Sequence, residues 1–168
     1  MTTPTATPTA TATPTPTATA TATAPAPLSP RAIALAHYAG RSLLEGVLAR
    51  HGATFEQSVT LRAVTAAGGS LGREELLADI TGSLKADRER VRALIEETTA
   101  AGLLEAGPWY GAALRLTGAG RELHERTSAE IAPVSARLYA GIPAQDLAVA
   151  GRVLALITER ADAELARA

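Results

Sequence analysis

A ten-residue segment, KADRERVRAL at positions 85–94, contains four basic and two acidic side chains. If this segment and the residues that follow it form a helix, one side of the helix contains Val91, Leu94, Ile95 and Thr98. The charged groups then lie on exposed flanks, where guanidinium groups suit phosphate contacts or bidentate contacts with guanine, and a carboxylate can accept from cytosine. The candidate residues for contact with nucleic acid are Lys85, Arg88, Glu89, Arg90 and Arg92, with Arg115 further along the chain.

The same charges have a second interpretation as an ordinary solvated helix face. Arg92 can pair with Glu89 or Glu96, and each such pair contributes only about 0.3–0.5 kcal/mol. The charge pattern by itself favours the solvated face. Only the arrangement of the neighbouring helices and strands can favour contact with nucleic acid over the solvated face.

The amino acid composition divides the chain into a tail and one domain. Residues 1–30 are almost entirely Thr, Ala and Pro and carry no charge, so we expect a disordered extension. Residues 31–168 are long enough to bury a core. The net charge of −1 gives no global attraction to nucleic acid, so any contact must come from a local patch. We find neither a signal peptide nor a membrane-spanning segment, and we expect a cytoplasmic protein.

Metal and catalytic chemistry find little support. The chain has no cysteine, which excludes disulfides and thiolate metal sites. The three histidines, His37, His51 and His124, do not have the spacing of a metal site. No serine lies in a nucleophile motif, and no phosphate loop is present. We therefore expect neither a cofactor nor enzymatic activity.

From Arg31 onward the pattern is helical. A first helix ends at His51-Gly52, and Thr54 opens a second helix with a capping box that Gln57 completes. Gly68-Gly69 ends this second helix. A short helix from Gly72 to about Ile80 is expected to be interrupted by Thr81-Gly82-Ser83. Asp87 then caps a helix that runs to Ala101 and ends at Gly102.

Beyond Gly102 the period changes to that of a β-hairpin, with strands at 103–106 and 112–116. Thr117 is a plausible N-cap for a helix over 121–139, which Pro133 should kink or end early. After Gly141-Ile-Pro143 comes a final helix whose wide apolar face needs a partner, and a second subunit is the expected one.

Several phrases occur in an order and spacing that resemble the MarR family of bacterial transcription regulators, from Arg31 to Ala168. They are QSVTLRAV at 57–64, LKADRERV at 84–91, GLLE at 102–105, LTGAG at 116–120 and AGIPAQDL at 140–147. The resemblance implies a mainly α fold, a winged helix-turn-helix (54–117) with a small β-hairpin wing. It also implies a helical dimerisation domain built from the first and last helices (31–53 and 118–168).

The resemblance further implies a homodimer that binds a palindromic operator in double-stranded DNA. It implies a repressor relieved by a small aromatic or phenolic ligand bound between the two domains. His37, at the edge of the apolar stripe of the first helix, and Trp109 and Tyr110, in the hairpin turn, are the candidate ligand-binding residues. Trp109 and Tyr110 could equally press on DNA, or pin the hairpin to a neighbouring helix.

The sequence departs from the family pattern at two places. The wing turn GPWYG at 107–111 lacks the arginine expected there, and the connection from Thr81 to Ala86 is longer than the usual tight turn. The uncharged wing and the acidic face with Glu89 and Glu96 favour an alternative function, a winged-helix module for protein interaction or dimerisation that has lost DNA reading.

Overall fold

The computed structural model describes residues 27–107 and 113–167. The expectations for the tail up to residue 26, and for Trp109 and Tyr110, lie outside these residues. The elements are α1 (Pro30–Arg50), α2 (Phe55–Ala66), β1 (Ser70–Gly72), α3 (Arg73–Leu84), α4 (Arg88–Ala100), β2 (Leu104–Ala106), β3 (Ala113–Leu116), α5 (Gly118–Tyr139) and α6 (Ala144–Leu165).

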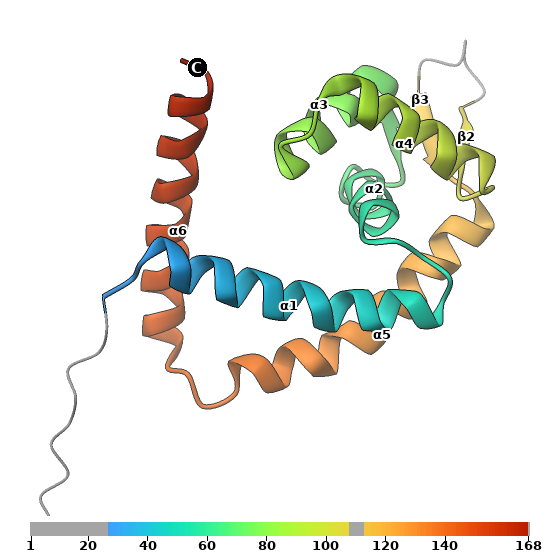
Figure 1. Ribbon diagram of the computed structural model, residues 1–168. Helices are drawn as coiled ribbons and strands as arrows, with labels where there is room; N and C mark the ends of the chain where they lie inside the picture. The colour runs from blue at the N-terminus through green and yellow to red at the C-terminus, as the bar shows by residue number, and fades with distance from the viewer. Residues whose placement is uncertain (1–26, 108–112, 168) are drawn as a thin grey trace, which may run out of the picture.

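The elements form two lobes. Helices α2, α3 and α4 pack with the small sheet into one lobe, while α1 and α5 lie along each other beneath it (Figure 1). Helix α6 stands to one side and has no buried residue. The mainly α, winged helix-turn-helix architecture expected from the sequence is confirmed.

The hydrophobic core lies in the helix-turn-helix lobe. Its side chains come from α2, α3, α4 and all three strands, and burial of each contributes about 1.5–3 kcal/mol. Those exposed by 2 % or less include Leu61, Val64, Leu76, Leu77, Ile80, Val91, Ile95, Leu104 and Leu114.

The predicted helix caps are confirmed. Thr54 and Gln57 form the capping box at α2, with both hydrogen bonds present at 3.0 and 3.1 Å. Asp87 Oδ1 accepts from the backbone N–H of Arg90 at 2.8 Å, and Thr117 Oγ1 accepts from Gly120 at 3.0 Å. Because each such cap contributes roughly 1 kcal/mol, local sequence determines where these helices begin.

The wing contains a strand that sequence reasoning missed. β1 joins the hairpin in an antiparallel sheet of order β1-β3-β2, so that Ser70 pairs with Arg115 on one side and Glu105 pairs with it on the other. Three residues, Ser70-Leu-Gly72, are too few to show a strand period. The third strand supports a hairpin that would otherwise be marginal by itself.

One expected helix boundary is wrong. Helix α3 does not stop near Ile80 but continues through Thr81-Gly82-Ser83 to Leu84, which packs against the core. Glycine inside a helix costs about 1 kcal/mol, and burial of the neighbouring apolar side chains outweighs this cost. Helix α5 reaches its expected end at Tyr139 with Pro133 inside it, so of the two expected effects of the proline, a kink or an early end, the early end does not occur.

The connection between α3 and α4 is correspondingly shorter than expected. It consists of Lys85, Ala86 and Asp87 only, which is a tight helix-turn-helix turn. The long connection inferred from Thr81 to Ala86 is therefore wrong.

Within the described residues, no single helix is both long and apolar enough to cross a membrane. Only α5 and α6 taken together pass that test, and they meet at a bend of 106°.

Candidate nucleic-acid interface

The turn in front of α4 is fixed by its backbone. Lys85 adopts the left-handed conformation (φ 52°, ψ 36°), and it is the only non-glycine residue with positive φ in the described ranges. This conformation costs a residue other than glycine about 1–2 kcal/mol. The Asp87 cap follows two residues later, so the first turn of α4 has a defined position relative to the end of α3.

The two faces of α4 are those predicted from the sequence. The buried residues are Val91, Leu94, Ile95 and Thr98. All the charged side chains of α4 are exposed, and they comprise three arginines and three glutamates. The outward surface of α4 therefore has no net charge.

Four of the six candidate residues form ion pairs with carboxylates of the same chain. Arg88 Nη2 lies 2.8 Å from Glu74 Oε2 of α3, and Arg90 Nη1 lies 3.4 Å from Glu97 Oε1. The other two pairs are Arg115–Glu105 at 2.9 Å, across the wing strands, and Lys85–Asp162 at 2.6 Å, between the turn and α6. Among the described residues, Arg92 forms no ion pair, and its possible pairing with Glu89 or Glu96 is not observed.

These pairs are weak enough to be exchanged. The paired side chains are 44–74 % exposed, and exposed ion pairs contribute about 0.2–1 kcal/mol. At the three arginine pairs a phosphate group can replace the carboxylate at small cost.

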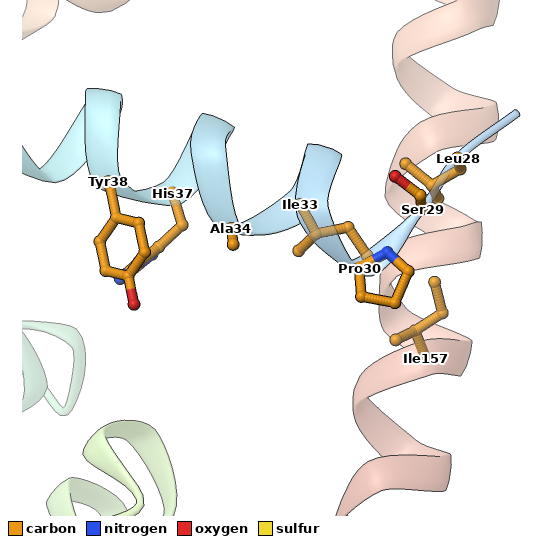
Figure 2. A pocket seen from close by; sticks show the side chains of 8 residues that line it. All are labelled: Leu28, Ser29, Pro30, Ile33, Ala34, His37, Tyr38 and Ile157. Atoms are coloured by element: carbon orange, nitrogen blue, oxygen red, sulfur yellow. The ribbon is translucent and has the colours of Figure 1, made fainter. Parts of the chain in front are cut away.

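His37 lies in an apolar hollow of about 550 Å³ between the N-terminal part of α1 and α6 (Figure 2). Its ring meets that of Tyr38 edge to face, with 5.5 Å between centroids. Ile157 closes the hollow from α6. The structure therefore places His37 on the α1 side of this hollow, whose lining contains no residue of α4.

A second hollow, which sequence reasoning missed, lies where α1, α2 and α5 meet. It encloses about 260 Å³ and is lined by Leu44, Ser58, Arg62, His124, Thr127, Ser128, Ile131 and Ala132. The guanidinium of Arg62 and the imidazole of His124 are thus brought beside apolar side chains and hydroxyl groups. Because the three helices are separate in sequence, no motif could indicate this hollow.

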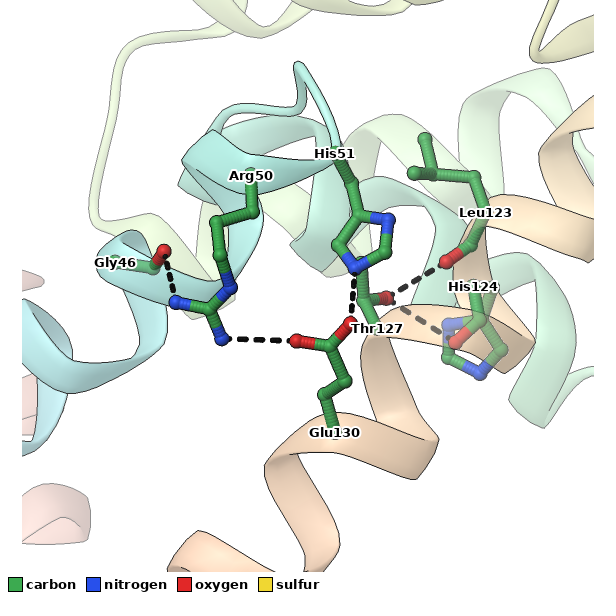
Figure 3. Close-up of polar contacts among 7 residues, drawn as sticks. All are labelled: Gly46, Arg50, His51, Leu123, His124, Thr127 and Glu130. Atoms are coloured by element: carbon green, nitrogen blue, oxygen red, sulfur yellow. Dashed lines mark hydrogen bonds and ion pairs between the residues drawn. The ribbon is translucent and has the colours of Figure 1, made fainter.

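A carboxylate joins the end of α1 to α5 next to that hollow (Figure 3). Glu130 Oε2 accepts from Arg50 Nη2 at 2.8 Å, and Glu130 Oε1 lies 2.7 Å from His51 Nε2. The hydrogen bond from Arg50, and then that from His51, lowers the pKa of Glu130. The contact therefore ties the end of α1, just before the Gly52 turn into α2, to α5.

Within the residues described, no three His, Asp or Glu side chains gather in a way that could hold a metal ion.

No family model matches this sequence, and no curated protein matches it. Solved structures do match. Ligand-free NadR superposes with a TM-score of 0.64 at 18 % identity, covering 79 % of this chain and 97 % of NadR. A MarR mutant from E. coli in complex with operator DNA gives 0.62 at 17 % identity, covering 76 % and 91 %. Bordetella bronchiseptica BpsR, whose DNA binding is regulated by 6-hydroxynicotinic acid, gives 0.59 at 20 % identity, covering 79 % and 99 %.

These chains share the arrangement of helices and wing over most of their length. The chain therefore has the MarR winged-helix fold that its sequence resembles. At this level of identity the likeness is one of fold.

Proposed function

We propose that this chain, which has the MarR fold, is a homodimeric regulator that binds double-stranded DNA at a palindromic operator and represses transcription. The proposal further includes release by a small aromatic acid. It is supported by the fold of regulators such as the E. coli MarR mutant, which is known in complex with operator DNA.

The DNA-binding proposal rests on the exposed position of the N-terminal turns of α4. A three-residue turn and the Asp87 cap present the first turns of α4 at the surface, with Arg88 and Arg92 one helical turn apart on one flank. In a helix-turn-helix, such residues reach phosphates and base edges in the major groove. Arg90 projects from the other flank, where it can contact the opposite strand.

The homodimer is proposed from the unpartnered apolar surface of α6 and its surroundings. Large apolar side chains that a folded chain would normally cover are exposed there by 37–66 %: Leu35, Tyr38, Leu138, Tyr139, Ile142, Val149, Val153, Leu154, Leu156, Ile157 and Leu165. Large apolar side chains left exposed in such number are typical of an interface. A second copy of the chain offers the same helices in return.

The hollow between α1, α2 and α5 is the proposed effector site. Arg62 and His124 can hold a carboxylate, and Leu44 and Ile131 can cover an aromatic ring. A ligand bound between α1, α2 and α5 would change the orientation of α4 relative to α1 and α5. BpsR, which is regulated by a hydroxylated pyridine carboxylic acid, is a structural neighbour of this chain.

A second candidate function is the interaction module without DNA reading. It is favoured by the zero net charge of α4 and by the ion pairs that Arg88 and Arg90 already form with carboxylates of the same chain. This module would dimerise yet show no salt-dependent affinity for DNA.

Selection from a random duplex library, followed by titration of the selected duplex at several salt concentrations, separates the two functions. We expect the wild-type protein to enrich a palindrome. Replacing both Arg88 and Arg92 by alanine should weaken binding and flatten the salt slope by about 0.9 for each phosphate that is no longer neutralised. Arg126→Ala, an exposed arginine of α5, is the matched control. Failure to enrich any duplex, or equal binding by the double variant, would support the interaction module instead.

Sedimentation velocity tests the homodimer independently of DNA. Val153→Glu combined with Leu156→Glu places two charges on the exposed apolar face of α6, and this variant should sediment as a monomer. Glu159→Gln, on the same helix, should remain dimeric. A wild-type chain that sediments as a monomer at micromolar concentration would refute the dimer.

A further inference from the structure

An ion pair links the turn in front of α4 to the far end of α6. Lys85 Nζ lies 2.6 Å from Asp162 Oδ1, and both side chains are about half exposed. Lys85 belongs to the helix-turn-helix lobe, whereas Asp162 lies in the C-terminal part of α6, which faces the end of α3 (Figure 1). The pair therefore connects the helix-turn-helix lobe to α6.

Lys85 cannot move independently of α4. It stands in a three-residue turn in the left-handed conformation, between Leu84 and Ala86, which both pack against the core. Two residues later the Asp87 side chain caps α4. Any displacement of the Lys85 backbone is thus passed to the first turn of α4, where Arg88 begins the helix.

Within the described chain, α6 has few other supports. None of its residues is buried, and it departs from α5 at 106°. Ile157 meets the N-terminal part of α1 in the apolar hollow (Figure 2). Asp162 follows Ile157 by five residues, about 7.5 Å along the helix axis. The two contacts together define how α6 lies relative to α4.

We propose that the Lys85–Asp162 pair is a strut that sets the distance between the two recognition helices of the dimer, and so makes Asp162 a positioning residue for half-site spacing. This inference rests on the proposed function, because spacing has meaning only for a dimer on a two-fold operator. It assigns Lys85 to the α6 contact in preference to the DNA phosphates.

Half-site spacing is sensitive to such a strut for a geometric reason. Two half-sites on one face of DNA lie about 10 base pairs apart, so one inserted pair moves a half-site by about 3.4 Å and rotates it by about 35°. A dimer with firmly placed α4 helices cannot follow both changes. A dimer with loosely placed α4 helices can adapt, and its discrimination between spacings decreases.

The competing role for Lys85 predicts a different result. If its ammonium contacts a phosphate, removing Asp162 frees the cation and raises affinity on every duplex alike. The strut predicts that relative affinities change while the affinity for the best spacing stays close to that of the wild type.

The experiment measures binding of the wild-type protein and Asp162→Asn to the selected palindrome and to versions with one or two base pairs added or removed between half-sites. We expect the wild-type preference for the best spacing to fall by about two- to five-fold in Asp162→Asn, the range expected for removal of an exposed ion pair. Glu159→Gln, which removes a charge from α6 one turn away, should keep the wild-type preference.

Charge exchange supplies a rescue. Lys85→Glu alone and Asp162→Lys alone place like charges together and should both reduce the spacing preference, whereas the double variant should recover it even if its overall affinity is lower. A uniform affinity gain in Asp162→Asn, or no recovery in the double variant, overturns the strut. If the wild-type protein selects no duplex, the proposed function itself fails, which is a distinct result.

A second measurement needs no DNA. Since the chain contains no cysteine, Glu96→Cys introduces a single spin-label site on each α4. The distance between the two labels in the dimer, measured by double electron–electron resonance, should have a narrow distribution. Asp162→Asn should broaden it, and Glu159→Gln should not. An unchanged width in Asp162→Asn contradicts the strut.

Discussion

Arg88 of α4 reaches back to Glu74 in the first turn of α3, with 2.8 Å between Nη2 and Oε2. The arginine is therefore held by a carboxylate at the surface proposed to meet DNA. We expect Glu74→Gln to raise the affinity for random duplex by about two- to five-fold, because Arg88 no longer has to exchange an ion pair for a phosphate.

The measurement is a fluorescence anisotropy titration with selected and random duplexes. The gain should be larger for random DNA, so that the ratio of specific to non-specific affinity falls. Glu125→Gln removes an exposed charge from α5 and should leave that ratio unchanged. A decrease of affinity in Glu74→Gln would mean that Glu74 positions Arg88 for binding.

The hollow between α1, α2 and α5 should bind a small aromatic anion. Benzoate and 6-hydroxynicotinate are suitable probes, and benzamide is the matched neutral compound. At a concentration 100 times its dissociation constant, a ligand adds about 2.7 kcal/mol to stability, which thermal unfolding detects readily. Arg62→Gln should abolish most of this stabilisation. Equal stabilisation by benzamide, or full stabilisation of Arg62→Gln by benzoate, would contradict an anion site.

Gly120, in the first turn of α5, should tolerate no side chain. A Cβ atom placed there would lie 2.1 Å from the carbonyl oxygen of Leu103, which also accepts from the backbone N–H of Thr117. Gly120→Ala should therefore destabilise the protein by about 1–3 kcal/mol or more. Gly118→Ala, two residues earlier with nothing within 4 Å of its Cβ, should be neutral or stabilising by up to about 1 kcal/mol. Urea unfolding of both variants gives the comparison, and equal stability of the two would refute the close approach.

The Glu130 contact should stabilise the protein only while its carboxylate is ionised. The hydrogen bonds from Arg50 and His51 lower the pKa of Glu130 from its ordinary value of 4.5. A lowered folded-state pKa gives stability that is present above the unfolded-state pKa and disappears as pH falls through the folded-state pKa. Glu130→Gln should therefore be less stable than the wild type near pH 7, and the difference should shrink below pH 4.5. Urea unfolding between pH 3 and 7 measures this difference, and a difference that does not change with pH would contradict it.

Local sequence predicted those parts of the fold that depend on local chemistry. Thr54, Asp87 and Thr117 each begin a helix because their side chains satisfy backbone donors only a few residues away. The buried face of α4 followed from helical periodicity for the same reason. The winged-helix arrangement followed from the order of these elements and the resemblance they carry.

The errors arose where distant packing decides the structure. Helix α3 continues across Gly82 because Ile80 and Leu84 pack against the core, which no local propensity reveals. Strand β1 exists because β3 lies beside it. The hollow containing Arg62 and His124, and the pair Lys85–Asp162, each join residues from separate helices, so only the folded chain brings them together.

The balance of three arginines and three glutamates on α4 has a consequence for how much of this protein a cell would need. A genome offers about 10⁶–10⁹ competing sites to any cationic surface, and these sites retain most copies of a strongly basic protein. A recognition helix without net charge is retained far less by bulk DNA. For such a helix in a DNA-binding regulator, a small number of copies would be enough to keep an operator occupied.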